Sequence, residues 1–257
     1  MSRSDRIFCF EALDVCDPLV RAAERLYELT QHPDERIPWG WIARSIKGRV
    51  GWRPGAWNRH LLVATPSERA TDPTALAGFA YGAHLPGYGG YLCYIGVADA
   101  VRKRGVGTRL YHQMFKVLAA DACAIDEPLP FVVWESHKPG PDAPEDDWKL
   151  WEARVRLFGK VGGLWIDGLE LMTPNCATDD GPSVPLQLFV KPVDLPASAF
   201  DADRLRGVAA GLLEGVYRTE PGDPLYDATL PPGCEPRLRP ASEAGRRKEA
   251  GQALAVA

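Results

Sequence analysis

Apolar residues recur along the chain with spacings that change from segment to segment, and these spacings predict where helices and strands form. Recurrence at every third or fourth position predicts helices that begin after a capping residue and end at glycine or proline. The predicted helices follow Asp17-Pro18 and end at His32-Pro33, cover residues 39–46, run from Gly105 towards Pro128, and follow the Pro- and Asp-rich segment 139–147 as far as Gly162-Gly163.

Short apolar runs between these helices predict strands. They lie at residues 7–10, 61–64, 76–81, 91–97, 131–134, 164–172 and 186–190. The consecutive runs within 61–97 have short connections, which indicates an antiparallel meander. The order strand, helix, strand between residues 91 and 134 indicates a crossover with parallel pairing. Together the segments predict an α/β (α+β) fold with a mixed, mostly antiparallel central sheet flanked by helices.

The pattern changes after Pro192. One further amphipathic helix is expected at about residues 200–218, and from Glu220 onward proline, glycine and charged residues dominate. Because a segment of this kind buries little apolar surface, we expect a poorly structured tail. The chain is therefore divided into a first domain, residues 1–194, and a C-terminal extension, residues 195–257.

The composition mainly excludes classes of protein and kinds of site. The 257 residues are 46% hydrophobic and carry a formal net charge of −4, so there is material for a core and no general attraction for nucleic acid or anionic membranes. The chain has no apolar run of about 18 residues and no secretory signal near Met1, and we expect it in the cytoplasm. The six cysteines form no C-x-x-C pair, which predicts free thiols and no metal site.

A candidate anion site lies in the segment Val97–Tyr111, where three cations come directly before a glycine-containing helix start. The first N–H groups of a helix have no partner within it, and together with the helix dipole they favour an anion. Gly105 and Gly107 let a phosphate oxygen approach the backbone, and Arg102 and Arg104 could clamp it. For an isolated R-x-x-G-x-G the alternative is a basic surface turn, and neither established phosphate-loop motif is present.

Taken with the order of elements, the segment resembles the GCN5-related N-acetyltransferase (GNAT) superfamily, whose signature is Q/R-x-x-G-x-G/A after a strand ending in V-x-P. Val97 and the run Arg102-Lys103-Arg104-Gly105-Val106-Gly107 match this signature, and Asp99 replaces the usual proline. The resemblance covers about residues 5–192. It implies a GNAT-like fold with acetyl-CoA, or another acyl-CoA, as co-substrate and with no metal.

The resemblance also implies where the co-substrate binds. Its pyrophosphate would bind the backbone amides from Lys103 to Thr108, and its pantetheine arm would pair with the strand edge Tyr94 to Val97, like a strand added to an open sheet edge. The implied binding residues are Ile95, Gly96, Val97, Arg102, Lys103, Arg104, Gly105, Val106, Gly107 and Thr108.

Acetyl transfer to a primary amine by direct attack requires a base, a stabilised carbonyl oxygen and a proton for the leaving thiolate. Glu135 is the first candidate base, because burial at the end of an apolar strand would raise the pKa of its carboxyl. His137 shares its side of the strand and titrates near neutral pH. Purely structural roles for both residues stay equally open. Backbone N–H groups near Ile95 to Val97 could stabilise the oxygen.

Two departures from the family pattern concern the proton donor. Phe158 stands where the family often has a tyrosine, and the strand Tyr91 to Tyr94 lacks the family's frequent glutamate. Tyr94, Tyr91, Tyr81 or a water is left to protonate the thiolate, or the thiolate leaves unaided; Tyr94 is taken as the catalytic candidate. The departures also support an alternative function, a non-catalytic acyl-CoA-binding or regulatory module.

The acceptor site is expected between the N-terminal helices and the loop after the central strand, as the resemblance implies. Its candidate residues are Glu35, Trp39 and Tyr81. Acidic residues at 142 and 145–147 could attract a cationic amine, but stabilising charges at a helix N-terminus explain them better. Four tryptophans either line the pocket or pack under a loop; they are Trp39, Trp41, Trp52 and Trp57.

The expected partner is an amine acceptor, which can be a small molecule, a peptide or a protein. Three cations on an acidic chain are too few for a nucleic-acid surface, and no membrane partner is expected. A homodimer is compatible with the sequence.

Overall fold

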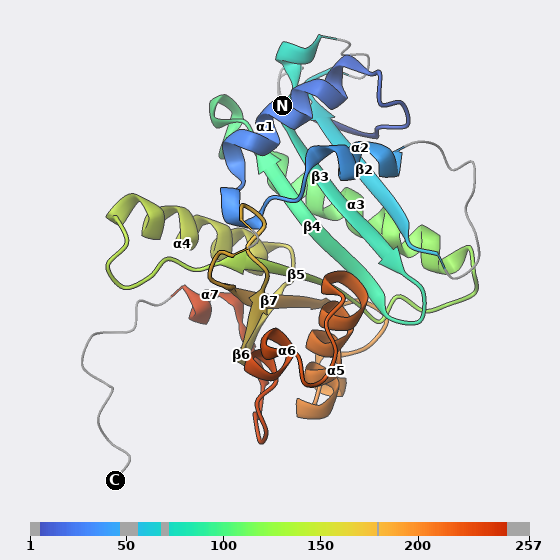
Figure 1. The fold of residues 1–257 in the computed structure, drawn as a ribbon. Coiled ribbons are helices and arrows are strands. Elements are labelled where there is room, and N and C mark those ends of the chain that lie inside the picture. The colour runs from blue at the N-terminus through green and yellow to red at the C-terminus, as the bar shows by residue number, and fades with distance from the viewer. Residues whose placement is uncertain (1–5, 47–55, 68–71, 179, 246–257) are drawn as a thin grey trace.

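The computed structural model describes residues 6–46, 56–67, 72–178 and 180–245, and these form one eight-stranded sheet with helices on both faces (Figure 1). The strands are β1 (Phe8–Glu11), β2 (Asn58–Thr65), β3 (Gly78–Leu85), β4 (Gly89–Val97), β5 (Phe131–His137), β6 (Leu164–Thr173), β7 (Val184–Pro192) and β8 (Arg237–Pro240). Their order across the sheet is β1-β2-β3-β4-β5-β7-β6-β8. Every neighbouring pair is antiparallel except β4 and β5, which confirms the predicted mixed, mostly antiparallel sheet.

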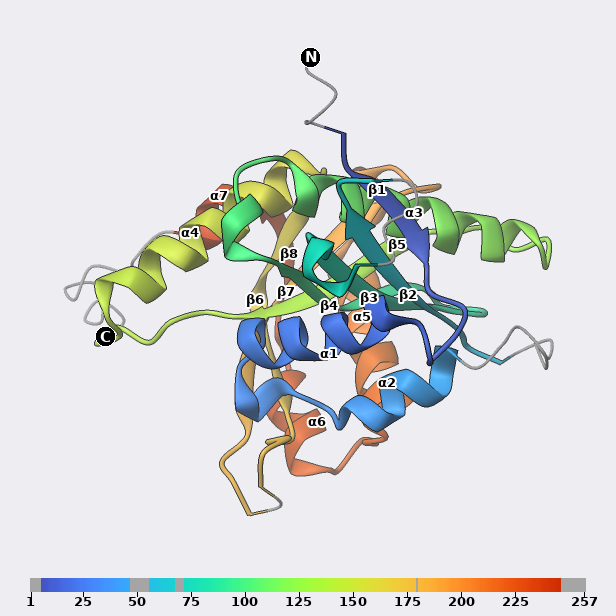
Figure 2. The same ribbon diagram turned by 90° about the horizontal axis from the view of Figure 1, so that it is seen from above.

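The helices divide between the two faces of this sheet (Figure 2). They are α1 (Pro18–Thr30), α2 (Trp39–Ile46), α3 (Val106–Cys123), α4 (Glu145–Lys160), α5 (Ala202–Leu212), α6 (Pro224–Thr229) and α7 (Ala241–Ala244). Helices α3 and α4 cover one face, whereas α1 and α2 cover β2 to β4 on the other. Helix α5 lies on that second face against β5, β6 and β7.

Local signals set the limits of α1 as the sequence predicts. The side chain of Asp17 accepts a hydrogen bond of 2.8 Å from the N–H of Leu19, and Pro18 occupies the first turn, where its missing N–H costs nothing. The apolar face of the helix, including the fully buried Ala23, packs towards the sheet. This helix and the segment after it form one wall of the cavity described below.

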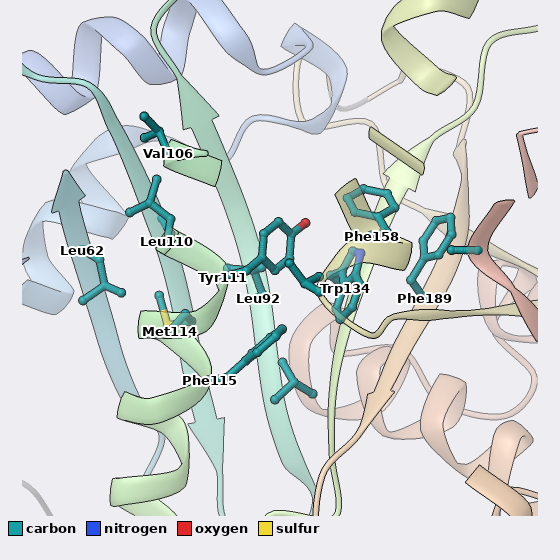
Figure 3. Packing of buried hydrophobic residues seen from close by; sticks show 14 of the residues in the cluster. Leu62, Leu92, Val106, Leu110, Tyr111, Met114, Phe115, Trp134, Phe158 and Phe189 are labelled. Carbon is teal, nitrogen blue, oxygen red and sulfur yellow. The ribbon is translucent and has the colours of Figure 1, made fainter. Parts of the chain in front are cut away.

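Aromatic rings fill the core between α3, α4 and the sheet. Trp134 of β5 stacks on Phe189 with ring centroids 6.3 Å apart, and Phe158 of α4 packs on Phe189 at 4.7 Å. Tyr111 of α3 completes the group (Figure 3). Edge-on and offset contacts of this kind stabilise a core beyond the apolar area they bury.

Successive residues of β5 alternate between the two faces of the sheet. Val132 and Trp134 belong to the core under α3 and α4, whereas Phe131 and Val133 belong to the core under α5. Because side chains two positions apart in a strand share a face, Glu135 and His137 continue the line of Val133 on the α5 face of the sheet.

Strands β4 and β5 pair only at their beginnings. Gly90 is opposite Val132 and Tyr91 opposite Val133, and no further β4–β5 pair occurs in the described ranges. Beyond this point the two strands diverge (Figure 1). The second half of β4 therefore has an edge without a strand partner, and a wedge opens inside the sheet.

A bulge in β4 lies beside this wedge. Tyr81 of β3 is opposite Tyr94, but the next residue, Gly82, is opposite Leu92. Cys93 is therefore an extra residue in β4, and an extra residue lets two successive side chains share a face. Cys93 and Tyr94 both reach the core under α1 and α2.

The C-terminal extension is more ordered than its composition predicts. The predicted helix at about 200–218 consists of α5 followed by a π-helical turn, Leu213–Tyr217. The expectation of a poorly structured tail is wrong for residues 224–245, which form α6, β8 and α7, while residues 246–257 lie outside the described ranges. Strand β8 pairs with β6, and the Trp151 indole of α4 donates a hydrogen bond of 3.2 Å to the carbonyl of Ala244. These partners are distant in sequence, so the local composition could not reveal them.

Candidate functional site

A cavity of about 1200 Å³ runs through the wedge between β4 and β5. Its walls come from α1 and the segment after it, from β3, β4, β5 and α4, and from the turn that follows α5. Arg102 before α3 and Arg218 after α5 both line the cavity. A single space is therefore bordered by a residue of the predicted anion site and by the turn after α5.

The turn before α3 has the backbone conformation that the glycine motif predicts. Gly105 is the N-cap of α3 with φ of 79°, and Lys103 also has a positive φ of 66°. Since a glycine cap has no side chain to accept hydrogen bonds, the first amides of α3 stay available to a ligand. A side-chain atom added at Gly105 would meet nothing within 4 Å, so the approach to these amides is open.

The cations of this turn differ in their positions. Arg102 lines the cavity and forms an ion pair of 2.7 Å with Asp99. Lys103 and Arg104 are exposed and do not line the cavity in the described part of the chain. The geometry thus favours Arg102 over Arg104 as the charged partner of an anion at this turn.

The edge of β4 that has no strand partner forms the next part of the wall. Tyr94, Ile95, Gly96 and Val97 all line the cavity. The carbonyl of Ile95 accepts a hydrogen bond of 3.0 Å from Nε2 of Gln31, so this carbonyl faces away from β3. The N–H and C=O groups of one strand residue project to the same side, and Ile95 therefore presents both groups to the wedge.

Glu135 lies where the wedge begins. The hydroxyls of Tyr91 and Tyr217 both donate hydrogen bonds to its Oε1, the second at 3.1 Å. Its Oε2 is shielded from solvent and has no hydrogen-bond partner among the described residues. Burial raises the pKa of this carboxyl to about 7, against the opposing effect of the two tyrosine hydrogen bonds. A carboxyl with this pKa and one uncommitted oxygen can accept a proton near neutral pH.

His137 lies further along the same side of β5. Its ring stacks on that of His32 with centroids 6.1 Å apart. Burial lowers the pKa of His137, and the neighbouring His32 adds to this effect. The ring lines the cavity, and its stacking partner is His32 and not Glu135.

The hydroxyl of Tyr94 is committed to the loop after α1. It donates a hydrogen bond of 2.7 Å to the carbonyl of Glu35 and accepts one of 3.2 Å from the N–H of Ile37. Burial raises its pKa well above the ordinary value for tyrosine. This geometry gives Tyr94 a structural role in holding the loop and leaves its proton engaged.

The three predicted acceptor residues have different surroundings. Glu35 and Tyr81 line the cavity; burial raises the pKa of Glu35, and Tyr81 donates a hydrogen bond of 3.1 Å to Oγ of Ser45. Trp39 does not line the cavity within the described ranges and packs on Tyr27 with ring centroids 5.4 Å apart. Its expected contact with the acceptor is therefore not supported, because the ring turns towards the core under α1.

The remaining acidic and aromatic candidates are also accounted for. Glu145, Asp146 and Asp147 form the first turn of α4, in agreement with a stabilising role at a helix N-terminus. Trp41 and Trp57 line the cavity, and Trp52 lies outside the described residues.

All six cysteines are free.

A tyrosine of α3 faces the residue that lacks the expected hydroxyl. The ring of Tyr111 is 6.1 Å from that of Phe158, and its hydroxyl points towards Phe158 (Figure 3). Both residues line the cavity. Among the described residues no hydrogen bond involves the Tyr111 hydroxyl, so its proton is uncommitted.

Sequence reasoning missed Tyr111, Tyr217 and three arginines that line the cavity, Arg44, Arg59 and Arg218. Tyr217 and Arg218 belong to the extension, which the composition separates from the site. Arg44 and Arg59 occupy an amphipathic helix and a strand end, where charged residues are ordinary. Only the long-range packing brings these side chains to the cavity.

Two searches for other features concern the described ranges only. Each helix there is too short or too polar to cross a bilayer. No group of three or more histidine, cysteine, aspartate or glutamate side chains there is arranged to hold a metal ion.

Comparisons with known proteins concern the family and the fold. Residues 20–126 match the family model described as the acetyltransferase (GNAT) family. No curated protein matches the sequence. Among solved structures, a protein from Bacteroides thetaiotaomicron described as an acetyltransferase of the GNAT family has a TM-score of 0.54 at 18% identity, covering 84% of this chain and 99% of its own.

Two further structures are less similar. The ribosomal-protein-S18-alanine N-acetyltransferase from Escherichia coli has a TM-score of 0.46 at 15% identity, covering 74% of this chain and 96% of its own. A Bacillus anthracis protein described as a streptothricin acetyltransferase, with acetyl coenzyme A bound, has a TM-score of 0.36 at 16% identity, covering 52% of this chain and 62% of its own.

Proposed function

Because residues 20–126 match the model of the GNAT family of acetyltransferases, we propose that the chain transfers the acetyl group of acetyl-CoA, or another acyl-CoA, directly to a primary amine. One observation carries the proposal: a single cavity is lined both by Arg102, which comes just before the glycine turn of α3, and by Glu135. The helix start beside Arg102 suits a pyrophosphate, and the carboxyl of Glu135 suits the removal of a proton from an amine.

The donor is assigned to the wedge between β4 and β5. Backbone amides from Val106 to Thr108 would bind its pyrophosphate, with Arg102 as the nearest cation of the turn. The edge groups of Ile95 would hydrogen-bond the peptide-like arm, which acts as an added strand. In this proposal the side chains of Lys103 and Arg104 add charge near the site but make no contact with the donor.

The reaction then needs one base and one proton donor. The amine nitrogen attacks the thioester carbonyl carbon, and the proton that the nitrogen loses goes to Oε2 of Glu135. Backbone N–H groups near the bulge at Cys93, with that of Ile95, stabilise the negative charge on the carbonyl oxygen. The carbon–sulfur bond breaks, and the thiolate takes one proton.

We assign that proton to the Tyr111 hydroxyl. Phe158 cannot donate one, and Tyr94 is engaged with the loop after α1. Tyr111 reaches the same region of the cavity from α3 and has no competing hydrogen bond in the described part of the chain. His137 is left as a wall residue, since its ring is stacked on His32.

The proposal is tested by measuring both binding and turnover. Acetyl-CoA should bind the protein in isothermal titration, and a panel of primary amines should release free CoA with time. Binding without release for any amine would favour the alternative, a non-catalytic acyl-CoA-binding module, which the phenylalanine at Phe158 and the missing glutamate on β4 support. If neither acetyl-CoA nor another acyl-CoA binds, both the proposed transfer and the alternative are wrong.

A further inference from the structure

Part of the cavity lining is cationic and aromatic. Arg44 of α2, Arg59 of β2 and Arg218 after α5 line the cavity, together with Trp41 and Trp57. The three arginines are exposed, so the cavity opens to solvent beside them. We call these five residues the arginine rim.

Trp57 organises two of the three arginines. The guanidinium carbon of Arg59 is 4.9 Å from the centroid of the Trp57 ring, and that of Arg218 is 5.7 Å from it. A guanidinium that lies over an indole is held by cation–π attraction while its N–H groups at the edge stay free to bind an oxyanion. In the described ranges, no ion pair joins a carboxylate to any of the three arginines.

The backbone ties Arg218 to the centre of the cavity. The residue before it, Tyr217, donates its hydrogen bond to Glu135. Arg218 itself has a left-handed conformation with φ of 61°, and its N–H donates to the carbonyl of Leu213, as does that of Thr219 at 3.0 Å. Such a conformation is strained for a residue with a side chain and persists only where neighbours enforce it. The backbone of Arg218 is thus held next to the residue that contacts the base.

Charges of both signs line the cavity. The carboxylates of Glu28, Glu35 and Asp147 lie on α1, the segment after it and α4, and two further cations, Arg102 and Arg154, lie before α3 and on α4. The arginine rim is formed by α2, β2 and the turn after α5, and contains no acidic side chain. An acceptor that enters here meets positive charge first and the carboxyl of Glu135 further inside.

We infer that the acceptor is a small primary amine that also carries a carboxylate or phosphate group, which the arginine rim binds while the amine faces Glu135. The inference rests on the proposed transfer to an amine and names the class of that amine. Charge-assisted hydrogen bonds from guanidinium groups suit both anions. Polycationic amines are disfavoured, because the same arginines repel them.

The test uses pairs of amines that differ only in the anionic group. β-Alanine is compared with its amide, O-phosphoethanolamine with ethanolamine, and spermidine represents polycations. Released CoA is measured by chromatography, since exposed cysteines such as Cys16 and Cys123 would react with a thiol reagent. The wild-type protein should favour an anionic member by about tenfold or more in kcat/KM, the scale of one hydrogen bond to a charged group.

Two variants locate the preference. Arg59→Gln and Arg218→Gln should each lower the ratio of anionic to neutral kcat/KM about tenfold and leave the Kd for acetyl-CoA unchanged. Arg156→Gln is the matched control, because Arg156 is exposed on α4 and pairs with Glu152 at 3.4 Å. The ratio is informative because a loss of stability would lower both rates together.

Each outcome has a definite reading. Preference for the carboxylate or for the phosphate pair supports the inference and identifies the anion. A preference for neutral amines or for spermidine overturns the inference and leaves the proposed transfer in place. A preference for anionic amines that persists in both arginine variants has the same meaning. Release of CoA with none of the amines, although acetyl-CoA binds, counts against the proposed transfer and the inference together.

Discussion

The hydroxyl of Tyr217 donates a hydrogen bond of 3.1 Å to Oε1 of Glu135, across 82 residues of sequence. The turn after α5 is thereby part of the wall around the buried carboxyl. Because the bond stabilises the charged carboxylate, it lowers the pKa that burial raises. The extension therefore influences the residue that we propose as the base.

Glu135→Gln should abolish most of the transfer while donor binding persists. The amide keeps the shape of the side chain but cannot take a proton, and loss of a general base costs about 10²- to 10⁴-fold in rate. Kinetic assays of CoA release should show this loss in kcat/KM, with the Kd for acetyl-CoA from titration calorimetry unchanged. A variant with near wild-type turnover would remove Glu135 from the mechanism.

Tyr217→Phe should move the pH dependence of turnover. The base acts when deprotonated, so kcat/KM should rise with pH through about 7 in the wild type. Removing the Tyr217 hydrogen bond raises the pKa of Glu135, which shifts this rise to higher pH. Tyr226→Phe is the matched control, because Tyr226 donates an equal bond of 3.1 Å to the exposed Glu214. Identical pH profiles for wild type and Tyr217→Phe would contradict the coupling.

Gly105→Glu should weaken binding of acetyl-CoA by about tenfold or more, since it places a negative charge at the amides that we assign to the pyrophosphate. The measurement is the Kd by titration calorimetry. Gly233→Glu provides the control: Gly233 has φ of 78°, and an added side-chain atom there also meets nothing within 4 Å. Both variants carry the same backbone strain and charge, so equal affinities would show that the α3 turn is not the site.

Tyr111→Phe should lower kcat by about 10²-fold or more if its hydroxyl protonates the thiolate. The substitution breaks no hydrogen bond among the described residues, so thermal stability should change little. Adding Phe158→Tyr in the same protein should restore part of the lost rate, because it returns a hydroxyl to the neighbouring position in the cavity. Unchanged kcat in Tyr111→Phe would indicate that the thiolate obtains its proton elsewhere or leaves without one.

His60 should make the stability of the fold depend on pH. Its ring is fully buried between Glu11 at 2.7 Å and Asp121 at 2.5 Å, and hydrogen bonds to these carboxylates raise its pKa to about 9 despite burial. The stabilisation is complete below the unfolded pKa of about 6.5 and is lost as pH rises to about 9, a change of about 3 kcal/mol.

Urea denaturation at several pH values tests this prediction. The free energy of unfolding should fall between about pH 6.5 and 9 in the wild type and change less in His60→Gln. His112→Gln is the control, since His112 is exposed on α3. A wild-type profile that is flat over this range would contradict the raised pKa.

Local chemistry explains which features the sequence predicts. The cap at Asp17, the proline at Pro18 and the apolar run before Glu135 act over a few residues, so α1 and the end of β5 are found where the pattern indicates. The glycine turn before α3 is likewise set by its own residues, and Gly105 has the positive φ that its motif implies.

Long-range packing explains the rest. β8 is a strand because β6 offers it an edge, and its own four residues give little indication of this. The sequence shows that Phe158 has no hydroxyl. It does not show that Tyr111 lies near Phe158, because that contact depends on how α3 packs on α4. The sequence does not separate the roles of Trp39 and Trp57, and only the fold shows that Trp57 lines the cavity whereas Trp39 packs on Tyr27.

Two residue pairs between β4 and β5 join the two halves of the sheet. On one side lie β1 to β4, and on the other lie β5, β7, β6 and β8. A donor that pairs with the edge of β4 would extend this junction as a temporary strand. The sheet would gain this strand when the donor binds and lose it when the CoA leaves, so the substrate serves as a structural component for as long as it stays bound.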